Sequence, residues 1–194
     1  MSASSPPDWY DGFDYRALGE VCDKVILMAH DYQWPSVPAD YVGGTNTDTP
    51  VTPINSVYSA LKALTHPETG VRDRSKLALA ISIGSAGLKV DGDGVLLSRD
   101  IYHPGPGIII QRLRQPDSEP GWSDRYCNPY LYYTAEDGSR FRLWYEDERS
   151  VTAKLRLARM LGVNGVSLWR LGVIPNYADE GLYYDIWSAV IQGR

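Results

Sequence analysis

Side chains that could do chemistry stand at the ends of two short apolar runs in this chain of 194 residues. Met28, His30 and Asp31 lie at the end of the first run, residues 24–29, and Trp169 lies near the end of the second. A carboxylate presents an acceptor to an amide N–H or a hydroxyl, and an indole presents a flat apolar face with one polar N–H. The pattern indicates a binding site built from the ends of two strands.

A third group, Trp144-Tyr145-Glu146-Asp147, combines two aromatic rings with two acids. Glu146, Asp147 and Glu148 are residue types that can act as general acids in catalysis. The same residues also suit the start of a helix, where carboxylates cap free N–H groups and complement the helix dipole. We therefore expect the acids to be structural.

The sequence lacks the residue patterns that several other common enzyme classes require. Ser82 and Ser85 lie beside glycines, but no Gly-x-Ser-x-Gly motif surrounds either of them, so a serine hydrolase is not indicated. The histidines and acids show no metal-ligand spacing, and no phosphate-binding glycine loop occurs, so we expect neither a metal nor a cofactor. Cys22 and Cys127 are far apart and are expected to be free thiols.

The composition indicates an ordinary globular domain. The formal net charge of −5 argues against binding nucleic acid, which needs a clustered basic surface. No apolar run approaches the ~18 residues of a membrane span, and the first residues lack the basic and apolar regions of a signal peptide. Tyrosine (14) and tryptophan (6) far outnumber phenylalanine (2), a usage that suits sugar-binding clefts as well as cores.

Three apolar runs are predicted to be buried parallel strands that alternate with helices. The strands are expected at 24–29, 76–83 and 163–171, and apolar residues at helical spacing predict helices at 53–64, 150–161 and 183–191. Thr52 is the expected N-cap of the helix that starts at Pro53. This alternation predicts an α/β fold.

The expected organisation has four parts. They are a flexible arm (1–12), barrel-type strand and helix units (13–87), an inserted, mostly antiparallel subdomain (88–146) and a final helix–strand–helix segment (147–194). Within the insertion, strands are expected at 108–113, 130–134 and 140–145. Asp137-Gly138 predicts a hairpin between the last two of these strands.

Four motifs, in order along the chain, resemble family 18 of the glycoside hydrolases, in particular its spore-germination and peptidoglycan-lytic branch. They are Met28-Ala29-His30-Asp31, the strand Lys-Leu-Ala-Leu-Ala-Ile, the hairpin Pro-Tyr-Leu-Tyr-Tyr…Asp-Gly with Trp-Tyr-Glu-Asp, and Gly-Val-Ser-Leu-Trp-Arg-Leu-Gly. The resemblance implies a (β/α)₈ barrel, which typically needs about 250 residues. We therefore expect a partial barrel, about the last three βα units, with an inserted α+β subdomain.

The resemblance also implies roles for residues. Asp31 matches the Asp of the family's Met-x-Tyr-Asp motif, which contacts the N-acetyl group of the substrate, and His30 stands in place of the Tyr. Trp169 matches the tryptophan beneath the reacting sugar, and Trp144 and Tyr145 match rings that line the cleft. The expected substrate-binding residues are Met28, His30, Asp31, Trp144, Tyr145 and Trp169, and Asp31 also has a supporting catalytic role.

One part of the family pattern is missing. The catalytic Glu of the family lies in Asp-x-x-Asp-x-Asp-x-Glu, and no such motif occurs here. Family enzymes cleave N-acetylglucosamine glycans with retention, and the sugar's own acetamido oxygen attacks the anomeric carbon. We therefore expect the C-terminal half of a family 18-like glycosidase that acts on chitin or peptidoglycan and is inactive alone. The family indicates an extracellular or cell-envelope location.

Two alternatives remain open. One is a non-catalytic carbohydrate-binding or assembly module. The other is a half-barrel that pairs with a second chain or an upstream half-barrel, because three parallel strands leave open sheet edges. An upstream sequence with the acid motif would favour the glycosidase, and its absence would favour the module.

Overall fold

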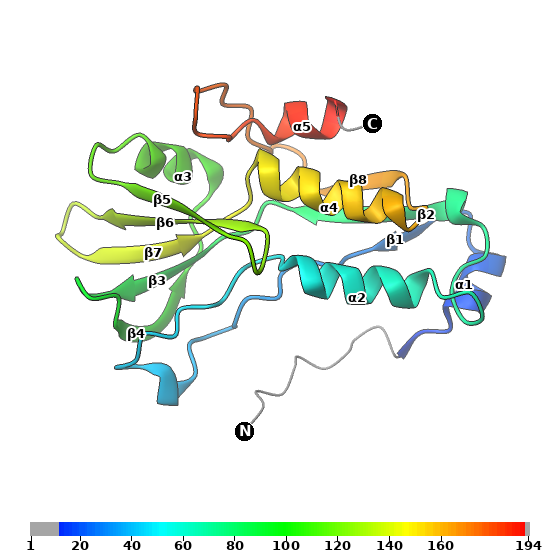
Figure 1. Cartoon of the computed structure of the whole chain (residues 1–194), viewed down its shortest axis with the longest axis horizontal. Helices are drawn as coiled ribbons and strands as arrows, with labels where there is room; N and C mark the ends of the chain where they lie inside the picture. The colour runs from blue at the N-terminus through cyan, green and yellow to red at the C-terminus, as the bar shows by residue number, and fades with distance from the viewer. Residues whose placement is uncertain (1–11, 193–194) are drawn as a thin grey trace.

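Two sheets lie side by side in the computed structural model, which describes residues 12–192 (Figure 1). The predicted arm, residues 1–12, falls almost wholly outside the described residues. The elements in chain order are α1 (Tyr15–Val21), β1 (Val25–Leu27), α2 (Ile54–Leu64), β2 (Leu77–Ser82), β3 (Ala86–Val90), β4 (Leu96–Tyr102), α3 (Pro106–Leu113), β5 (Glu119–Ser123), β6 (Asn128–Thr134), β7 (Arg140–Trp144), α4 (Glu148–Met160), β8 (Gly165–Trp169) and α5 (Ile186–Gln192).

The first sheet is parallel, and its strands lie in the order β1-β2-β8. Leu77, Leu79 and Ile81 of β2 face a core shared with α2 and α4, which cover one side of this sheet (Figure 1). Each helix contributes one apolar stripe, with Val57, Ala60, Leu61 and Leu64 buried in α2 and Val151, Leu155 and Ala158 buried in α4. The predicted α/β class is confirmed, and the described part of the chain contains no closed barrel.

The opposite face of the parallel sheet is only partly covered. Side chains alternate across a strand, so Ile26, Ser82 and Trp169 lie on the face away from the helices. Ile26 is 50% exposed and Trp169 is 56% exposed. The prediction that runs 24–29 and 163–171 are buried on both faces is therefore wrong, and only the central strand is buried throughout. The outer strands have one neighbour each, which leaves their side chains in contact with solvent.

The second sheet is antiparallel, and its strands lie in the order β4-β3-β7-β6-β5. The predicted strands 130–134 and 140–145 are present as β6 and β7, and the predicted hairpin joins them. Ala135 N donates to the Ser139 carbonyl (2.8 Å). Gly138 has a φ of +78°, a left-handed conformation that glycine adopts without a Cβ clash.

Residues 108–113 belong to helix α3, so the predicted strand is wrong. A run of isoleucines favours a strand locally. Pro106, however, occupies the first turn of a helix, where its missing N–H costs nothing. The helix then buries Ile109, Ile110 and Leu113 against the antiparallel sheet, which supplies the apolar surface that a strand would otherwise need.

The start of α2 also differs from the prediction. Its N-cap is Pro53, not Thr52, and no side chain caps it. Ile54 N instead donates to the Tyr126 carbonyl (2.9 Å), which lies between β5 and β6. A backbone group from the antiparallel sheet thus takes the place of the predicted side-chain cap.

A buried ion pair lies where the two sheets meet. Lys154 Nζ is 2.5 Å from Glu146 Oε2, and both side chains are 1% exposed. Asn128 Nδ2 donates to Glu146 Oε1 (2.6 Å), and Ser150 Oγ donates to Glu146 Oε2 (2.6 Å). Because both carboxylate oxygens have donors, the charge is compensated in spite of its burial. Asn128 begins β6 and Lys154 belongs to α4, so the group joins the antiparallel sheet to a helix of the parallel sheet.

Asp147 caps the same helix. Asp147 Oδ1 accepts from Ser150 N (2.8 Å), and Asp147 N donates to Ser150 Oγ (2.9 Å), so the two residues form a capping box. Arg149 Nε also donates to Asp147 Oδ2 (2.8 Å). The predicted structural role is confirmed for Glu146 and Asp147.

We expect Lys154→Ala to lower the free energy of unfolding by about 3–5 kcal/mol, because it leaves the Glu146 carboxylate buried without its counter-charge. Urea denaturation followed by tryptophan fluorescence measures the change. Arg156→Ala, at an exposed position of the same helix, is the control and should change stability by less than about 0.5 kcal/mol. A loss below about 1 kcal/mol for Lys154→Ala would show that the ion pair does not hold the two sheets together.

Candidate functional site

The carboxyl ends of the three parallel strands bring together side chains from distant parts of the chain. Asp31 follows β1, Ser82 ends β2 and Trp169 ends β8. Ser82 Oγ donates to Asp31 Oδ1 (2.9 Å), and Ser82 is the register partner of Trp169. Ile83 N also donates to the Trp169 carbonyl (3.3 Å). Asp31 and Trp169 therefore lie on either side of Ser82, at the same end of one sheet.

Two donors hold the carboxylate of Asp31. Nδ1 of His30 lies 2.9 Å from Asp31 Oδ2, and Ser82 occupies the other oxygen. The hydrogen bond from His30 lowers the pKa of Asp31; partial burial opposes this, and the charge of His30 and the bond from Ser82 lower the pKa further. Asp31 has a φ of +61°, which aspartate tolerates better than most residues. Its side chain is 43% exposed, so a ligand can reach it.

His30 is almost enclosed, with 7% of its side chain exposed. Its Nδ1 faces Asp31, and its Nε2 is buried without a hydrogen-bond partner among residues 12–192. Buried polar atoms are normally paired, so this nitrogen has unused hydrogen-bonding capacity beside a carboxylate. When Nδ1 carries the proton, Nε2 is an acceptor, and a second proton turns it into a donor.

A second imidazole, which the sequence reasoning missed, stands near this group. Nδ1 of His103 lies 2.6 Å from the Ser85 carbonyl, and Ser85 Oγ donates to the Pro104 carbonyl (2.7 Å). These bonds tie the loop after β4 to the end of β2, and the charge of His103 contributes to the low pKa of Asp31. Gly84 leaves room for the carboxylate, because a Cβ there would lie 3.1 Å from Asp31 Oδ1. In sequence, His103 only marks a turn rich in Gly and Pro.

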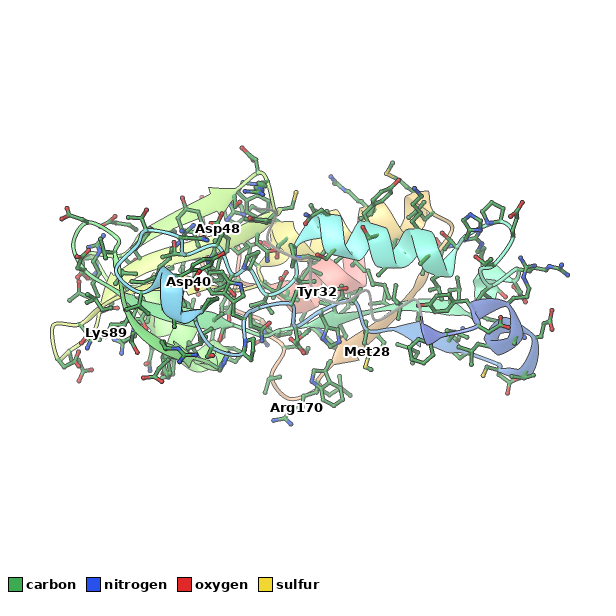
Figure 2. All side chains as sticks on the ribbon, turned by 90° about the horizontal axis from the view of Figure 1, so that it is seen from below. Met28, Tyr32, Asp40, Asp48, Lys89 and Arg170 are labelled. Carbon is green, nitrogen blue, oxygen red and sulfur yellow. The ribbon has the colours of Figure 1, made fainter. Side chains whose placement is uncertain are left out.

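Met28 and Trp169 add exposed apolar surface at the strand ends. Met28 is 69% exposed and Trp169 is 56% exposed. Figure 2 shows Met28 and Arg170 projecting on the side of the molecule opposite α2. The peptide bond between Trp169 and Arg170 is cis. An exposed indole near a carboxylate can hold a ligand that combines an apolar face with polar substituents.

Trp144 and Tyr145 lie in the interior and not, as expected, along a cleft. Their exposed fractions are 0% and 1%. Trp144 Nε1 donates to the Thr47 carbonyl (2.8 Å), and the guanidinium of Arg142 lies 4.6 Å from the Trp144 ring centroid. Tyr145 packs edge-on against Tyr184, and burial raises the pKa of Tyr145. An aromatic residue type suits a cleft and a core equally, so the sequence alone could not separate the two.

The long loop between β1 and α2 is fastened to the antiparallel sheet. Arg142 Nη1 donates to Thr47 Oγ1 and lies 3.8 Å from Asp48 Oδ1. Tyr126 Oη donates to Asp48 Oδ2 (3.2 Å), and Figure 2 shows Asp48 over this sheet. Asp31 lies near the start of this loop, so these contacts also fix the path of the chain as it leaves the site.

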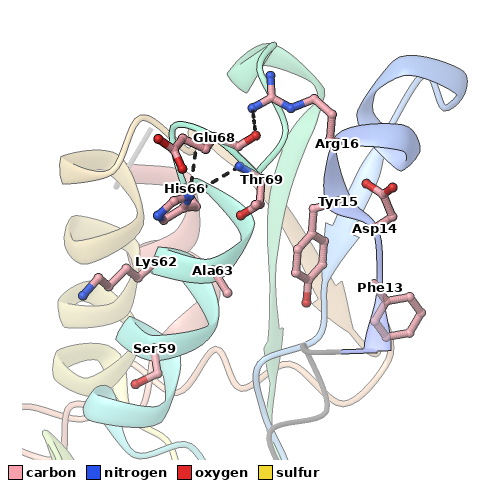
Figure 3. Close-up of a pocket in the computed structure, with 10 residues that line it drawn as sticks. All are labelled: Phe13, Asp14, Tyr15, Arg16, Ser59, Lys62, Ala63, His66, Glu68 and Thr69. Atoms are coloured by element: carbon pink, nitrogen blue, oxygen red, sulfur yellow. Dashed lines mark hydrogen bonds between the residues drawn. The ribbon is translucent and has the colours of Figure 1, made fainter.

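A pocket of about 700 Å³ lies at the other end of the parallel strands, between the start of α1 and the end of α2 (Figure 3). His66 Nδ1 accepts from the N–H groups of Glu68 and Thr69 (3.3 Å each), and Arg16 donates to the Glu68 carbonyl (2.6 Å). These polar groups hold the loop that follows α2. The pocket contains none of the predicted site residues.

Within residues 12–192, no group of three or more His, Cys, Asp or Glu side chains is placed to hold a metal ion. No helix in this part of the chain has the length and apolar character to cross a membrane. Cys22 and Cys127 are free and half-buried, as the sequence predicts.

Comparisons with known proteins agree with one another. The model of a family described as "Glycosyl hydrolases family 18" matches residues 1–173. The cortical fragment-lytic enzyme of Bacillus subtilis (strain 168) is 26% identical over 172 residues, which cover 89% of this chain and 36% of that enzyme. The spore cortex-lytic enzyme SleL of Bacillus cereus has a TM-score of 0.66 at 19% identity and is matched over 93% of this chain and 37% of its own.

A chitinase of Chromobacterium violaceum ATCC 12472 also has a TM-score of 0.66, at 24% identity, with 94% of this chain and 49% of its own covered. At these identities the solved structures establish similarity of fold. The chain spans 36% of the length of the curated relatives that it matches first, so it corresponds to a part of those proteins.

We expect the stability difference between the wild type and Asp31→Asn to shrink as the pH falls from about 5 to about 2. The pKa of Asp31 is lowered in the folded chain, so its contribution is complete above the ordinary aspartate pKa of about 3.9 and is lost as the pH falls through the lower folded value. Urea denaturation at several pH values measures the difference. Ser82→Ala removes one donor and should reduce the effect. A stability difference between the wild type and Asp31→Asn that does not change with pH would contradict the lowered pKa of Asp31.

Proposed function

Because the chain belongs to family 18 of the glycosyl hydrolases, we propose that it forms the last three βα units of that family's (β/α)₈ barrel, with an inserted α+β subdomain. The parallel order β1-β2-β8 supports this, since the helix after each strand contributes to the core on the same face. The antiparallel sheet interrupts the second unit, between β2 and α4. The observation that carries the proposal is the family match, taken with Asp31 and Trp169 at one end of the parallel sheet.

The proposed ligand is a glycan that contains N-acetylglucosamine. The relatives are named for lysis of spore cortex and for chitin, and N-acetylglucosamine occurs in both polymers. This sugar has an apolar ring face that an exposed Trp169 can cover, and its amide N–H and hydroxyls can donate to Asp31. Met28 would extend the apolar surface at the same strand ends.

The proposed reaction is substrate-assisted hydrolysis with retention. In this reaction the acetamido oxygen attacks the anomeric carbon while an acid protonates the leaving oxygen. A low pKa keeps Asp31 ionised at neutral pH, so it can accept the amide N–H and stabilise the positive charge that develops near the acetamido group. His30 stands in place of the family's tyrosine, and because its Nε2 is enclosed by protein, we expect it to weaken the contact with the acetamido group.

The acid itself is proposed to come from residues other than these. The sequence contains no Asp-x-x-Asp-x-Asp-x-Glu motif. β1 and β8 are the edge strands of the parallel sheet, and Ile26, Met28 and Leu171 are 50%, 69% and 73% exposed. Open edges and exposed apolar side chains favour association with further strands. We propose that these strands, from a second chain or from another part of the same protein, complete the barrel and carry the acid.

The second candidate is a non-catalytic carbohydrate-binding module. Among the described residues, no second carboxylate is hydrogen-bonded to His30 or Ser82 beside Asp31. A single carboxylate with these two polar neighbours is suited to binding a sugar. The two candidates differ in what added strands do. If addition of a polypeptide with the remaining family 18 strands and their Glu produces hydrolysis of the glycan, this chain is part of a glycosidase. If this chain binds the glycan but the mixture never hydrolyses it, this chain is a binding module.

We expect the isolated chain to release no product from a fluorogenic N-acetylglucosamine oligomer, because the leaving oxygen has no acid to protonate it. Loss of a general acid alone typically costs about 10²–10⁴-fold in rate. Continuous fluorimetry at micromolar protein measures release. Turnover within ten-fold of an ordinary enzyme, ~10 s⁻¹, would reveal a general acid among this chain's own residues.

Trp169→Ala should weaken binding of the N-acetylglucosamine hexamer by at least about ten-fold, because it removes the proposed stacking face. Isothermal titration calorimetry measures the dissociation constant. Trp169→Phe keeps an aromatic face and should retain part of the affinity. Cys22→Ser, before β1, is the control and should bind like the wild type. Equal affinity of Trp169→Ala and the wild type would exclude a sugar-binding role for this residue.

A further inference from the structure

A second pocket, of about 490 Å³, lies on the α3 side of the antiparallel sheet. It is lined by Tyr102 of β4, Arg112 of α3, Tyr133 of β6, Phe141 of β7 and the hairpin residues Glu136 and Asp137. The hairpin is at the start of β7, and the other end of this strand leads to α4 and the parallel sheet (Figure 1). The pocket is thus separate from the site at Asp31 and Trp169.

Aromatic rings form the floor of this pocket. Tyr133 and Phe141 stack with their centroids 5.5 Å apart, and Tyr102 lies 6.3 Å from Phe141. Tyr133 is 2% exposed, whereas Tyr102 is 46% exposed. Tyr102 is therefore the most accessible of these three rings, and Phe141 packs beside it. A tyrosine ring with a free face is suited to the C–H groups of a pyranose.

Arg112 supplies donors that the protein does not use. Its guanidinium lies 5.2 Å from the Tyr133 centroid, and its side chain makes no hydrogen bond or ion pair with the described residues; Nε is buried and unpaired. Two arginines near it in the fold are different. Arg114 pairs with Asp179 (2.8 Å), and Arg140 pairs with Glu119 (2.9 Å). A buried donor without a partner is costly, so Arg112 is poised to donate to a ligand.

The rim of the pocket carries acceptors as well. Asp137 accepts from Ser139 N and Ser139 Oγ (3.0 Å each), and these bonds lower its pKa, so it is ionised at neutral pH. Glu136 is exposed beside it. An anionic ligand would meet these carboxylates as well as Arg112. Sugar hydroxyls both donate and accept, so a neutral sugar fits this mixed set of groups.

We propose that this pocket binds a pyranose ring of a neutral glycan, stacked on Tyr102 and hydrogen-bonded by Arg112 and the hairpin carboxylates. The inference rests on the proposed function and deepens it. A second contact on the inserted subdomain would hold a glycan polymer at a point remote from Trp169. The pocket would then add little affinity for a short oligomer bound at the strand ends, and more for a long chain.

The test uses the full 194-residue chain and two probes, the N-acetylglucosamine hexamer and insoluble chitin. Tyr102→Ala should weaken adsorption to chitin about ten-fold, whereas Tyr102→Phe should stay within about two-fold of the wild type. Leu97→Ala, at another exposed apolar position of β4, is the matched control and should adsorb normally. Adsorption of Tyr102→Ala equal to that of the wild type would overturn the proposal.

A direct readout separates a binding site from a merely structural one. In the ¹⁵N-labelled chain, the Arg112 Nε–H resonance should move on titration with the hexamer, and the movement should persist in Trp169→Ala. If it is lost in Trp169→Ala, one site accounts for all binding and the second pocket is excluded. Polygalacturonate, in which each sugar carries a carboxylate, should not move the resonance, and a shift with this probe would exclude a neutral-sugar pocket.

The outcomes also distinguish this inference from the proposed function. Hexamer binding that depends on Trp169, with no effect of Tyr102→Ala on chitin, would leave the strand-end site in place and overturn only the second pocket. Absence of binding to either probe by the wild-type chain would overturn both.

Discussion

The buried carboxylate of Glu146 is the contact on which the arrangement of the two sheets depends. It follows the last strand of the antiparallel sheet, and its oxygens receive donors from Asn128 of β6 and from Ser150 and Lys154 of α4. A carboxylate removed from water is stable only when donors replace its hydration shell, so these elements must stay in register with one another. The helix α4 covers the parallel sheet, so this group ties the insertion to the helix layer of that sheet.

The geometry of the site at the strand ends also depends on how the two sheets are connected. β2 leads into β3 through a short link that contains Gly84 and Ser85, and Ser85 is tied to the loop of His103 and Pro104. This link brings a histidine from the insertion near Asp31 of the parallel sheet. The carboxylate therefore interacts with His30, Ser82 and His103, three residues that are far from one another in sequence. The low pKa of Asp31 owes most to the hydrogen bond from its neighbour His30, and tertiary packing adds the hydrogen bond from Ser82 and the charge of His103.

The two faces of the parallel sheet differ in how far they are covered, and this difference decides which side chains a ligand can reach. One face is covered by α2 and α4, and the other presents Ile26, Met28 and Trp169 to solvent. Strands of a parallel sheet are normally covered on both faces. The uncovered face is also the face that bears Ser82, so the exposed face of the sheet and the candidate site coincide. The proposed barrel would account for this coincidence, because the inner face of a (β/α)₈ barrel is covered by the other strands and the site lies at their carboxyl ends.

Features that depend on short-range pattern could be predicted from the order of the residues alone. The run 76–83 gave a buried strand, Asp137-Gly138 gave a hairpin, and Asp147 gave a helix cap, because each depends on residues within a few positions. Tertiary structure decided the rest. The isoleucines of α3 form a helix because the antiparallel sheet offers an apolar face, and Trp144 is buried because the loop at Thr47 lies over it. Burial and pKa depend on which distant surface covers a side chain, and that surface exists only after the chain has folded.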